Sequence, residues 1–170
     1  MAWTQNKKWS DQFIPEIKKI LGTYLIGEPP DEEDAFRNTD LIVLKMEPVR
    51  IACRVRRPEY CNYKNEFTIR QELPSGNKTE LSKILEGWGN YFFYGIADYN
   101  QHLQSWGLGD LNVFRLWFNQ RLFRLDKGSL PGKKKYNIDG SSNFLVFKWN
   151  EISEGFIVAS SNIKKEIHET

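Results

Sequence analysis

The first periodic stretch of the chain predicts one amphipathic helix with a single apolar stripe. The stripe residues recur at steps of four, four, three and four: Trp9, Phe13, Ile17, Ile20 and Tyr24. Ser10 or Asp11 can cap the start of this helix, so Pro15 falls near the first turn, where a missing N–H costs least. Glu16 lies at the edge of the buried stripe, and the helix ends near Gly27.

Three strands are predicted after this helix, because short apolar runs are bounded by turn residues. Residues 40–45 and 49–56 read as two strands that are joined by a turn around Pro48. Residues 65–70 read as a third strand, since they are rich in aromatic and β-branched side chains. The acidic segment 28–34 that precedes them is predicted to be a solvated loop.

The next part of the chain predicts a short helix and a buried strand. The helix covers residues 79–87, with Asn77 and Glu80 as its cap and Gly87 as its C-terminal stop. The strand covers residues 90–96 and reads as core, because its aromatic run is continuous.

The last part of the chain predicts a helix that begins at Asp110, followed by a closing hairpin. The residues of one face of this helix are apolar: Leu111, Phe114, Phe118 and Leu122. The hairpin is formed by residues 143–149 and 155–160. The complete order predicts a single α/β domain over residues 1–170, with one mixed sheet flanked by helices.

Composition agrees with a folded domain and limits its chemistry. The 170 residues are 40% hydrophobic and 14% aromatic, and the net charge is only +2. Positive charge is concentrated at residues 54–57 (RVRR) and at residues 132–136 (GKKKY), the second of which reads as a solvated loop.

Several functional classes are disfavoured by the residue types that the chain contains. Cys53 and Cys61 form neither a disulfide framework nor a CxxC pair, and Cys53 reads as a small hydrophobe. The two histidines, His102 and His168, do not suit a structural zinc site or a Ser-His-Asp arrangement. No apolar leader or membrane span is indicated, so a reducing cytoplasm fits best.

Polar residues from separate predicted elements stand at the edges of apolar segments or within them: Glu16, Asp40, Arg54, Arg56 and Glu80. An ordinary core avoids such a concentration of desolvated charge. This convergence predicts a functional cleft.

The element order over roughly residues 9–96 resembles the core of the restriction-endonuclease-like nucleases, the PD-(D/E)XK superfamily. That core consists of a helix, a three-strand meander, a helix and another strand. In this superfamily an Asp begins the second core strand, and a Glu-x-Lys pair lies on the third. Asp40 in NTDLIVL matches the Asp, and Glu16 matches an acid that the first helix commonly contributes. The resemblance implies Mg²⁺-dependent cleavage of a nucleic-acid phosphodiester, in a protein suited to a phage or mobile element.

The third strand departs from the superfamily pattern. Alignment of RIACRVR places Arg54 where Glu belongs and Arg56 where Lys belongs. Magnesium needs oxygen ligands, whereas a guanidinium group only donates hydrogen bonds. The pattern as it stands is therefore degenerate.

One hypothesis that accommodates the two arginines is a rearranged catalytic site. The second carboxylate would then come from Glu66 or from Glu80, so that Asp40 and Glu80 hold the magnesium ion. Lys83 lies three residues after Glu80, on the same helical face, and Lys83 or Arg56 would polarise the phosphate.

The other hypothesis is that the protein has lost the ability to cleave nucleic acid. The fold would keep a cationic cleft that binds backbone phosphates without cutting them, or would bind a protein partner. The residues of this cleft are arginines: Arg54, Arg56, Arg57 and Arg70.

A third class, a small-molecule enzyme, would use a pocket near Tyr94, Asp98 and His102. It lacks support from a cofactor motif, since the chain contains no GxGxxG and no P-loop.

Each candidate residue also has a purely structural interpretation. Asp40 can close a turn, and Glu80 can complete a helix cap. Arg54 and Arg56 can pair with Glu66 or Glu16. Because alternation assigns Ile51, Cys53 and Val55 to the core side, we expect both arginines to share the face of Asp40. We predict that at least one of them pairs with a carboxylate, since desolvating an unpaired guanidinium costs several kcal/mol. The candidate partners come from separate segments: Glu16, Asp40, Glu66 and Glu80.

Overall fold

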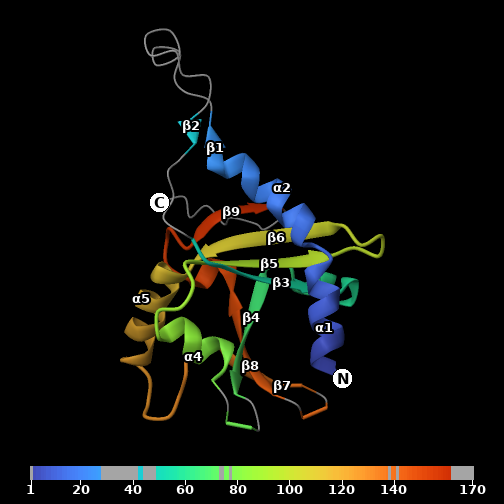
Figure 1. Ribbon diagram of the computed structural model, residues 1–170. Coiled ribbons are helices and arrows are strands. Elements are labelled where there is room, and N and C mark those ends of the chain that lie inside the picture. Colours follow the sequence, from blue (N-terminus) through green and yellow to red (C-terminus); the bar gives the residue numbers. More distant parts are fainter. Residues whose placement is uncertain are drawn as a thin grey trace, which may run out of the picture. The chain divides into compact units, whose positions relative to one another are not determined.

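The computed structural model describes residues 2–27, 42–43, 49–72, 75–76, 78–137, 139–140 and 142–161 (Figure 1). The chain divides into two compact units, residues 1–49 and residues 50–170, and each is described by itself. The prediction of a single domain over residues 1–170 stays a prediction.

The first unit contains two helices and a short antiparallel pair of strands: α1 (Ala2–Asp11), α2 (Ile14–Leu25), β1 (Ile26–Gly27) and β2 (Ile42–Val43). The single helix predicted from the apolar stripe is interrupted at residues 12–13. Pro15 is the second residue of α2, where the absence of its N–H leaves no helical hydrogen bond broken. The rings of Trp9 and Phe13 meet edge to face across the break, with their centroids 5.4 Å apart.

The second unit contains a four-stranded mixed sheet in the order β3-β5-β6-β9. The strands β3 and β5 are parallel, and the other neighbours are antiparallel. The bounds of its strands are β3 (Ile51–Arg56), β5 (Tyr91–Ala97), β6 (Leu103–Asp110) and β9 (Ile157–Ser161).

A three-stranded antiparallel sheet in the order β4-β8-β7 forms the other layer of this unit. The bounds of its strands are β4 (Glu66–Glu72), β7 (Lys133–Tyr136) and β8 (Asn143–Lys148). The helical segments of the unit are η1 (Pro58–Tyr63), α4 (Glu80–Leu85), α5 (Leu111–Leu122) and η2 (Trp149–Glu151). The α/β class and the flanking helices are therefore confirmed. Among the described helices none is long and apolar enough to cross a membrane.

The expected single sheet is replaced in this unit by two sheets. Residues 49–56 and 65–70 do not form part of one meander, because β3 pairs with β5 and β4 pairs with β8. The physical reason lies in β5, whose residues 92–97 are all buried. A strand buried on both faces belongs inside a sheet, and it is flanked here by β3 and β6.

Strand β6 had no counterpart in the prediction, because its glycines interrupt the apolar alternation. A Cβ atom at Gly109 would stand 2.5 Å from the ring of Phe156. The glycine is thus required for the close approach of the strand to this ring.

The predicted closing hairpin is also wrong. Strand β8 belongs to the three-stranded sheet and β9 to the four-stranded sheet, so the true hairpin is formed by β7 and β8. The segment 132–136, predicted as a loop, contains β7. Lysines suit this place, since β7 is an edge strand and charged edge residues oppose pairing with other chains.

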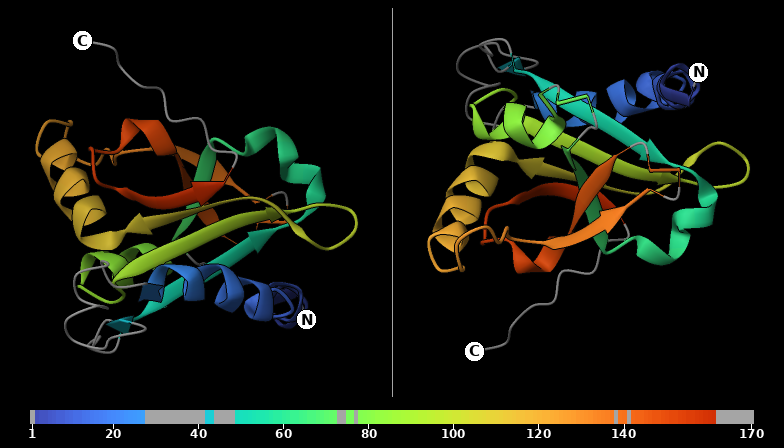
Figure 2. Two further views of the ribbon diagram at one scale, coloured as in Figure 1. Left: turned by 90° about the horizontal axis from the view of Figure 1, so that it is seen from above. Right: turned by 90° about the horizontal axis from the view of Figure 1, so that it is seen from below.

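One aromatic core is built from both sheets and α5. Its largest fully buried members include Phe67 of β4, Phe92 of β5, Phe114 of α5 and Phe147 of β8. Helix α5 confirms the prediction of a helix capped by Asp110, whose Oδ1 accepts hydrogen bonds from the backbone N–H groups that follow. Figure 2 shows α5 at one end of the two sheets and η1 at the other.

Two details of α5 differ from the prediction. Leu122 is 39% exposed rather than buried. Trp117 takes a place in the core instead.

Candidate functional site

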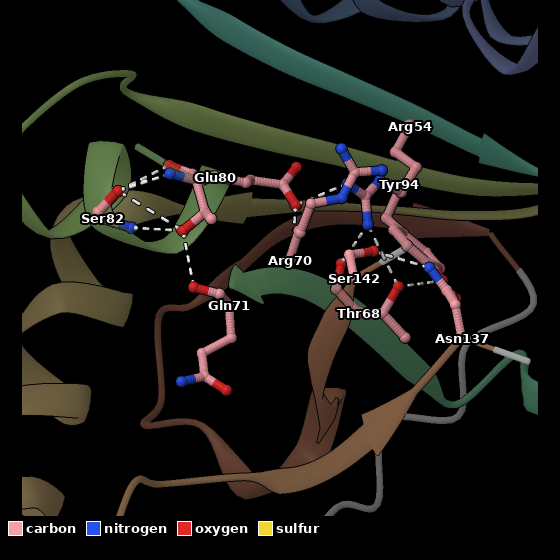
Figure 3. Close-up of polar contacts among 10 residues, drawn as sticks. Arg54, Thr68, Arg70, Gln71, Glu80, Ser82, Tyr94, Asn137 and Ser142 are labelled. Carbon is pink, nitrogen blue, oxygen red and sulfur yellow. Dashed lines mark hydrogen bonds and ion pairs between the residues drawn. The ribbon is translucent and has the colours of Figure 1, made fainter. Parts of the chain in front are cut away.

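Arg54 connects the two sheets of the second unit (Figure 3). From β3, its Nη1 donates to the backbone oxygen of Thr68 on β4 at 3.0 Å and lies 3.4 Å from the Thr68 hydroxyl. Its Nη2 donates to Oε2 of Glu80 at 2.6 Å. The two charged side chains are 23% and 21% exposed, so the ion pair is largely removed from water. The prediction that at least one of the two arginines pairs with a carboxylate is confirmed.

The face of β3 that carries Arg54 differs from the expectation. Ala52, two residues before Arg54, packs against the aromatic core. Arg54 therefore projects toward the core side of the sheet, where β4 supplies its acceptors. Val55 on the opposite face is also buried. Alternation could not identify the core side, because both faces of the strand are partly covered.

Glu80 is free to bind Arg54 because another residue caps its helix. Thr79 is the N-cap of α4, and it forms a reciprocal capping box with Ser82. The Thr79 hydroxyl also donates to the backbone oxygen of Gln71 at 2.9 Å, which fastens α4 to β4. The predicted capping role of Glu80 is wrong, and Asn77 lies outside the described residues.

The same Glu80 oxygen serves β4 as well. The backbone N–H of Arg70 donates to Oε2 of Glu80 at 2.9 Å. One carboxylate oxygen therefore accepts from a guanidinium group and from a strand N–H, and these donors fill its hydrogen-bonding capacity in the plane of the group.

The side chain of Arg70 is the second guanidinium group of this site. Partial burial, and then the positive charge of Arg54, lower the pKa of Arg70, while Glu80 acts in the opposite direction. Within the described part of the chain, the only hydrogen bond of Arg70 outside its strand ladder comes from its backbone. Among the described residues, only Arg54 forms an ion pair with Glu80, so the two guanidinium groups carry more positive charge than this one carboxylate neutralises.

Hydroxyl groups extend the site toward the centre of the four-stranded sheet. The Thr68 hydroxyl and the Tyr94 hydroxyl lie 3.2 Å apart, and Tyr94 is only 5% exposed. We call Arg54, Thr68, Arg70, Glu80 and Tyr94 the arginine cluster.

The remaining predicted arginines lie where β3 ends. The guanidinium carbon of Arg56 stands 3.8 Å from the centroid of the Tyr60 ring, a cation–π contact. Arg57 is exposed and precedes η1, which begins with Pro58. Arg56 and Arg57 are thus placed beside η1, while Arg54 and Arg70 belong to the arginine cluster.

The predicted catalytic residues are only partly brought together. Asp40 lies outside the described residues, and Glu16 belongs to α2 in the first unit. Lys83 is exposed on α4, three residues after Glu80. Glu66 begins β4 and is paired in register with Lys148. The meeting of Glu16 and Asp40 with the other residues stays a prediction.

The surroundings of Glu80 do not fit a magnesium ion. Its Oε2 already accepts two hydrogen bonds, and the Arg54 guanidinium beside it would repel a cation. Searching the described ranges for groups of three or more His, Cys, Asp and Glu residues that could hold a metal finds none.

The residues of the small-molecule alternative have structural roles. Tyr94 is buried in the arginine cluster, whereas Asp98 follows β5. Oδ1 of Asp98 accepts from the backbone N–H groups of Asn100 and His102 at 2.9 and 2.8 Å, and so shapes the turn before β6.

Comparison of the chain with models of known protein families, with curated proteins and with solved structures gave no match.

Proposed function

We propose that this chain binds the phosphate backbone of nucleic acid without cutting it. The observation that carries the proposal is the pair of guanidinium groups near the Glu80 carboxylate: Arg54 forms an ion pair with it, whereas the partly buried Arg70 guanidinium forms no ion pair with any described residue. Keeping two like charges together costs stability, so the arrangement is best explained by an anionic ligand. A guanidinium group suits a phosphate because its fork of donors matches two oxygens.

The same geometry favours binding over catalysis. In the nuclease superfamily that the sequence resembles, a Glu occupies the place of Arg54 and helps to hold magnesium. Here Arg54 forms an ion pair with Glu80, which is the carboxylate that a rearranged site would need as its second magnesium ligand. A restriction-endonuclease-like core is part of this proposal in an altered form: α4 and β5 follow in the expected order and β5 is parallel to β3, whereas β4 pairs in the other sheet.

Binding can be measured by fluorescence anisotropy with a labelled oligonucleotide over a series of salt concentrations. We expect affinity that falls steeply with salt, because phosphate binding releases counterions. Arg70→Gln should weaken binding about tenfold and reduce the salt slope by roughly 0.7–0.9, the amount that corresponds to one phosphate contact.

Arg124→Gln is the matched control, because it removes the same charge from an exposed residue that follows α5. Equal effects of the two substitutions would contradict a specific site at Arg70. No binding by the unaltered chain at low salt would overturn the proposal and would favour a protein partner.

Cleavage is tested separately with plasmid, single-stranded DNA and RNA in the presence of Mg²⁺ or Mn²⁺. We expect the nucleic acid to remain intact. Cleavage that disappears in the Asp40→Ala variant would overturn the non-catalytic part of the proposal and restore the rearranged nuclease site.

A further inference from the structure

Three exposed tyrosines lie on η1 and β7, which the prediction from sequence left without a role. Tyr60 is 40% exposed, Tyr63 is 49% exposed and Tyr136 is 69% exposed. The rings of Tyr60 and Tyr63 are 6.5 Å apart. Although η1 and β7 are distant in sequence, they are neighbours, because the Nζ atom of Lys135 stands 5.6 Å from the Tyr63 ring. Figure 2 shows β7 and η1 toward the same side of the second unit.

Each of these tyrosines has a cation against its ring. Arg56 stands over Tyr60 at 3.8 Å, and Lys134 stands 5.4 Å from the Tyr136 ring. The cation at the Tyr63 ring is Lys135. Because successive side chains of a strand point to opposite faces, Lys135 and Tyr136 lie on opposite faces of β7. Arg56, Tyr60, Tyr63 and Lys135 therefore form one surface, whereas Lys134 and Tyr136 belong to the other face of the strand.

This surface carries more positive than negative charge. Its cations are Arg56 and Lys135, each of which lies by one of its rings. The acidic residue that η1 contributes is Glu59. We call Arg56, Tyr60, Tyr63 and Lys135 the basic tyrosine surface.

Edge protection explains part of this composition but not all of it. Lysines on β7 discourage pairing of an edge strand with other chains. That function does not require the exposed rings of Tyr60 and Tyr63, which lie on η1 and not on the edge strand. Tyrosines interleaved with cations match a partner that has both flat aromatic groups and negative charge.

We propose that the basic tyrosine surface binds single-stranded nucleic acid, with unpaired bases stacked on Tyr60 and Tyr63 and with phosphates held by the cations Arg56 and Lys135. Bases in a duplex are stacked on one another, so only an unpaired strand offers free base faces to these rings. The inference rests on the proposed function, because it names the class of nucleic acid that the chain binds.

The test compares the affinity of one labelled oligonucleotide as a single strand, in DNA and RNA forms, with that of its DNA duplex at the same salt concentration. We expect the single strands to bind more tightly. In the Tyr60→Ala/Tyr63→Ala variant, single-strand affinity should fall about tenfold for each ring that stacks a base, while duplex affinity is unchanged. The Tyr60→Phe/Tyr63→Phe variant keeps the rings and should bind like the unaltered chain.

The outcomes separate this inference from the proposed function. The inference would be overturned if the alanine variant bound single strands as tightly as the unaltered chain does. It would also be overturned if the unaltered chain bound the duplex as tightly as the single strand. If Arg70→Gln still weakened binding in that case, the proposed function would stand. If no oligonucleotide bound at low salt, both would fail. Far-UV circular dichroism of each variant checks that these exposed substitutions leave the fold intact.

Discussion

Nη2 of Arg54 and Oε2 of Glu80 are 2.6 Å apart, and this pair joins the four-stranded sheet to the helix that packs on the other sheet. Because Arg54 also donates to the backbone of Thr68, one side chain holds three elements together. The pair therefore contributes to the fold itself, apart from any contribution to ligand binding.

Arg54→Ala should lower the free energy of unfolding by about 2–3 kcal/mol, because it leaves the Glu80 carboxylate without its countercharge in a mostly buried place. Urea unfolding of Arg54→Ala, Glu80→Ala and the double variant measures the coupling. We expect a coupling energy of roughly 1–3 kcal/mol. Additive losses would show that the ion pair contributes nothing beyond the packing of each side chain.

Arg70→Gln should behave in the opposite way in the same unfolding experiment. The positive charge of Arg54 and partial burial both lower the pKa of Arg70, so the charged form is less favourable in the folded protein than in the unfolded chain. Removing this charge should raise the denaturation midpoint or leave it unchanged. A large loss of stability would mean that Arg70 has a structural role, and would weaken its assignment to phosphate binding.

The two cysteines should differ in their reactivity. Burial raises the pKa of the Cys53 thiol to about 11, whereas Cys61 is exposed. At pH 8 a chromogenic disulfide reagent should modify Cys61 rapidly and Cys53 only after unfolding, because the thiolate is the reacting form. In Cys61→Ser the fast reaction should disappear. A fast reaction that persists in this variant would contradict the burial of Cys53.

The raised pKa of Cys53 also predicts how stability depends on pH. The folded-state pKa of about 11 lies above the ordinary value of 9.0, so the unfolded chain loses this proton first as the pH rises. The associated stability is complete below pH 9 and is lost as the pH rises through 11. Cys53→Ala should show a smaller decline over this range when both proteins are unfolded with urea.

Gly109→Ala should destabilise the second unit by about 1–3 kcal/mol, since the added methyl group would stand 2.5 Å from the buried Phe156 ring. Gly22→Ala is the matched control, because in the described part of the chain no atom beyond the adjacent residues and the backbone of α2 lies within 4 Å of the new methyl group. That control should raise stability by up to about 1 kcal/mol through helix propensity. Thermal unfolding measures both changes: the melting temperature should fall in Gly109→Ala and should rise or stay the same in Gly22→Ala.

Local patterns in the sequence were sufficient for the elements whose formation depends on nearby residues. Asp110 followed by an apolar helical face predicted α5, and the continuous aromatic run predicted β5 as a core strand. The need to neutralise a desolvated guanidinium likewise predicted that Arg54 or Arg56 would pair with a carboxylate. Each of these inferences rests on a local signal or on a cost that applies in any fold.

The tertiary structure alone decided which strands are neighbours and which carboxylate Arg54 meets. The apolar runs of β3 and β4 look alike, but burial of both faces of β5 draws β3 beside it and leaves β4 to the other sheet. Glu80 was one of four carboxylates that the sequence offered to Arg54, and its alternative role as a helix cap is filled by Thr79 and Ser82 instead. Likewise η1 and β7 are far apart in sequence, so the contact between Lys135 and Tyr63 arises only when the chain folds. Strand pairing and surface assembly depend on contacts between distant segments, and local periodicity does not encode them.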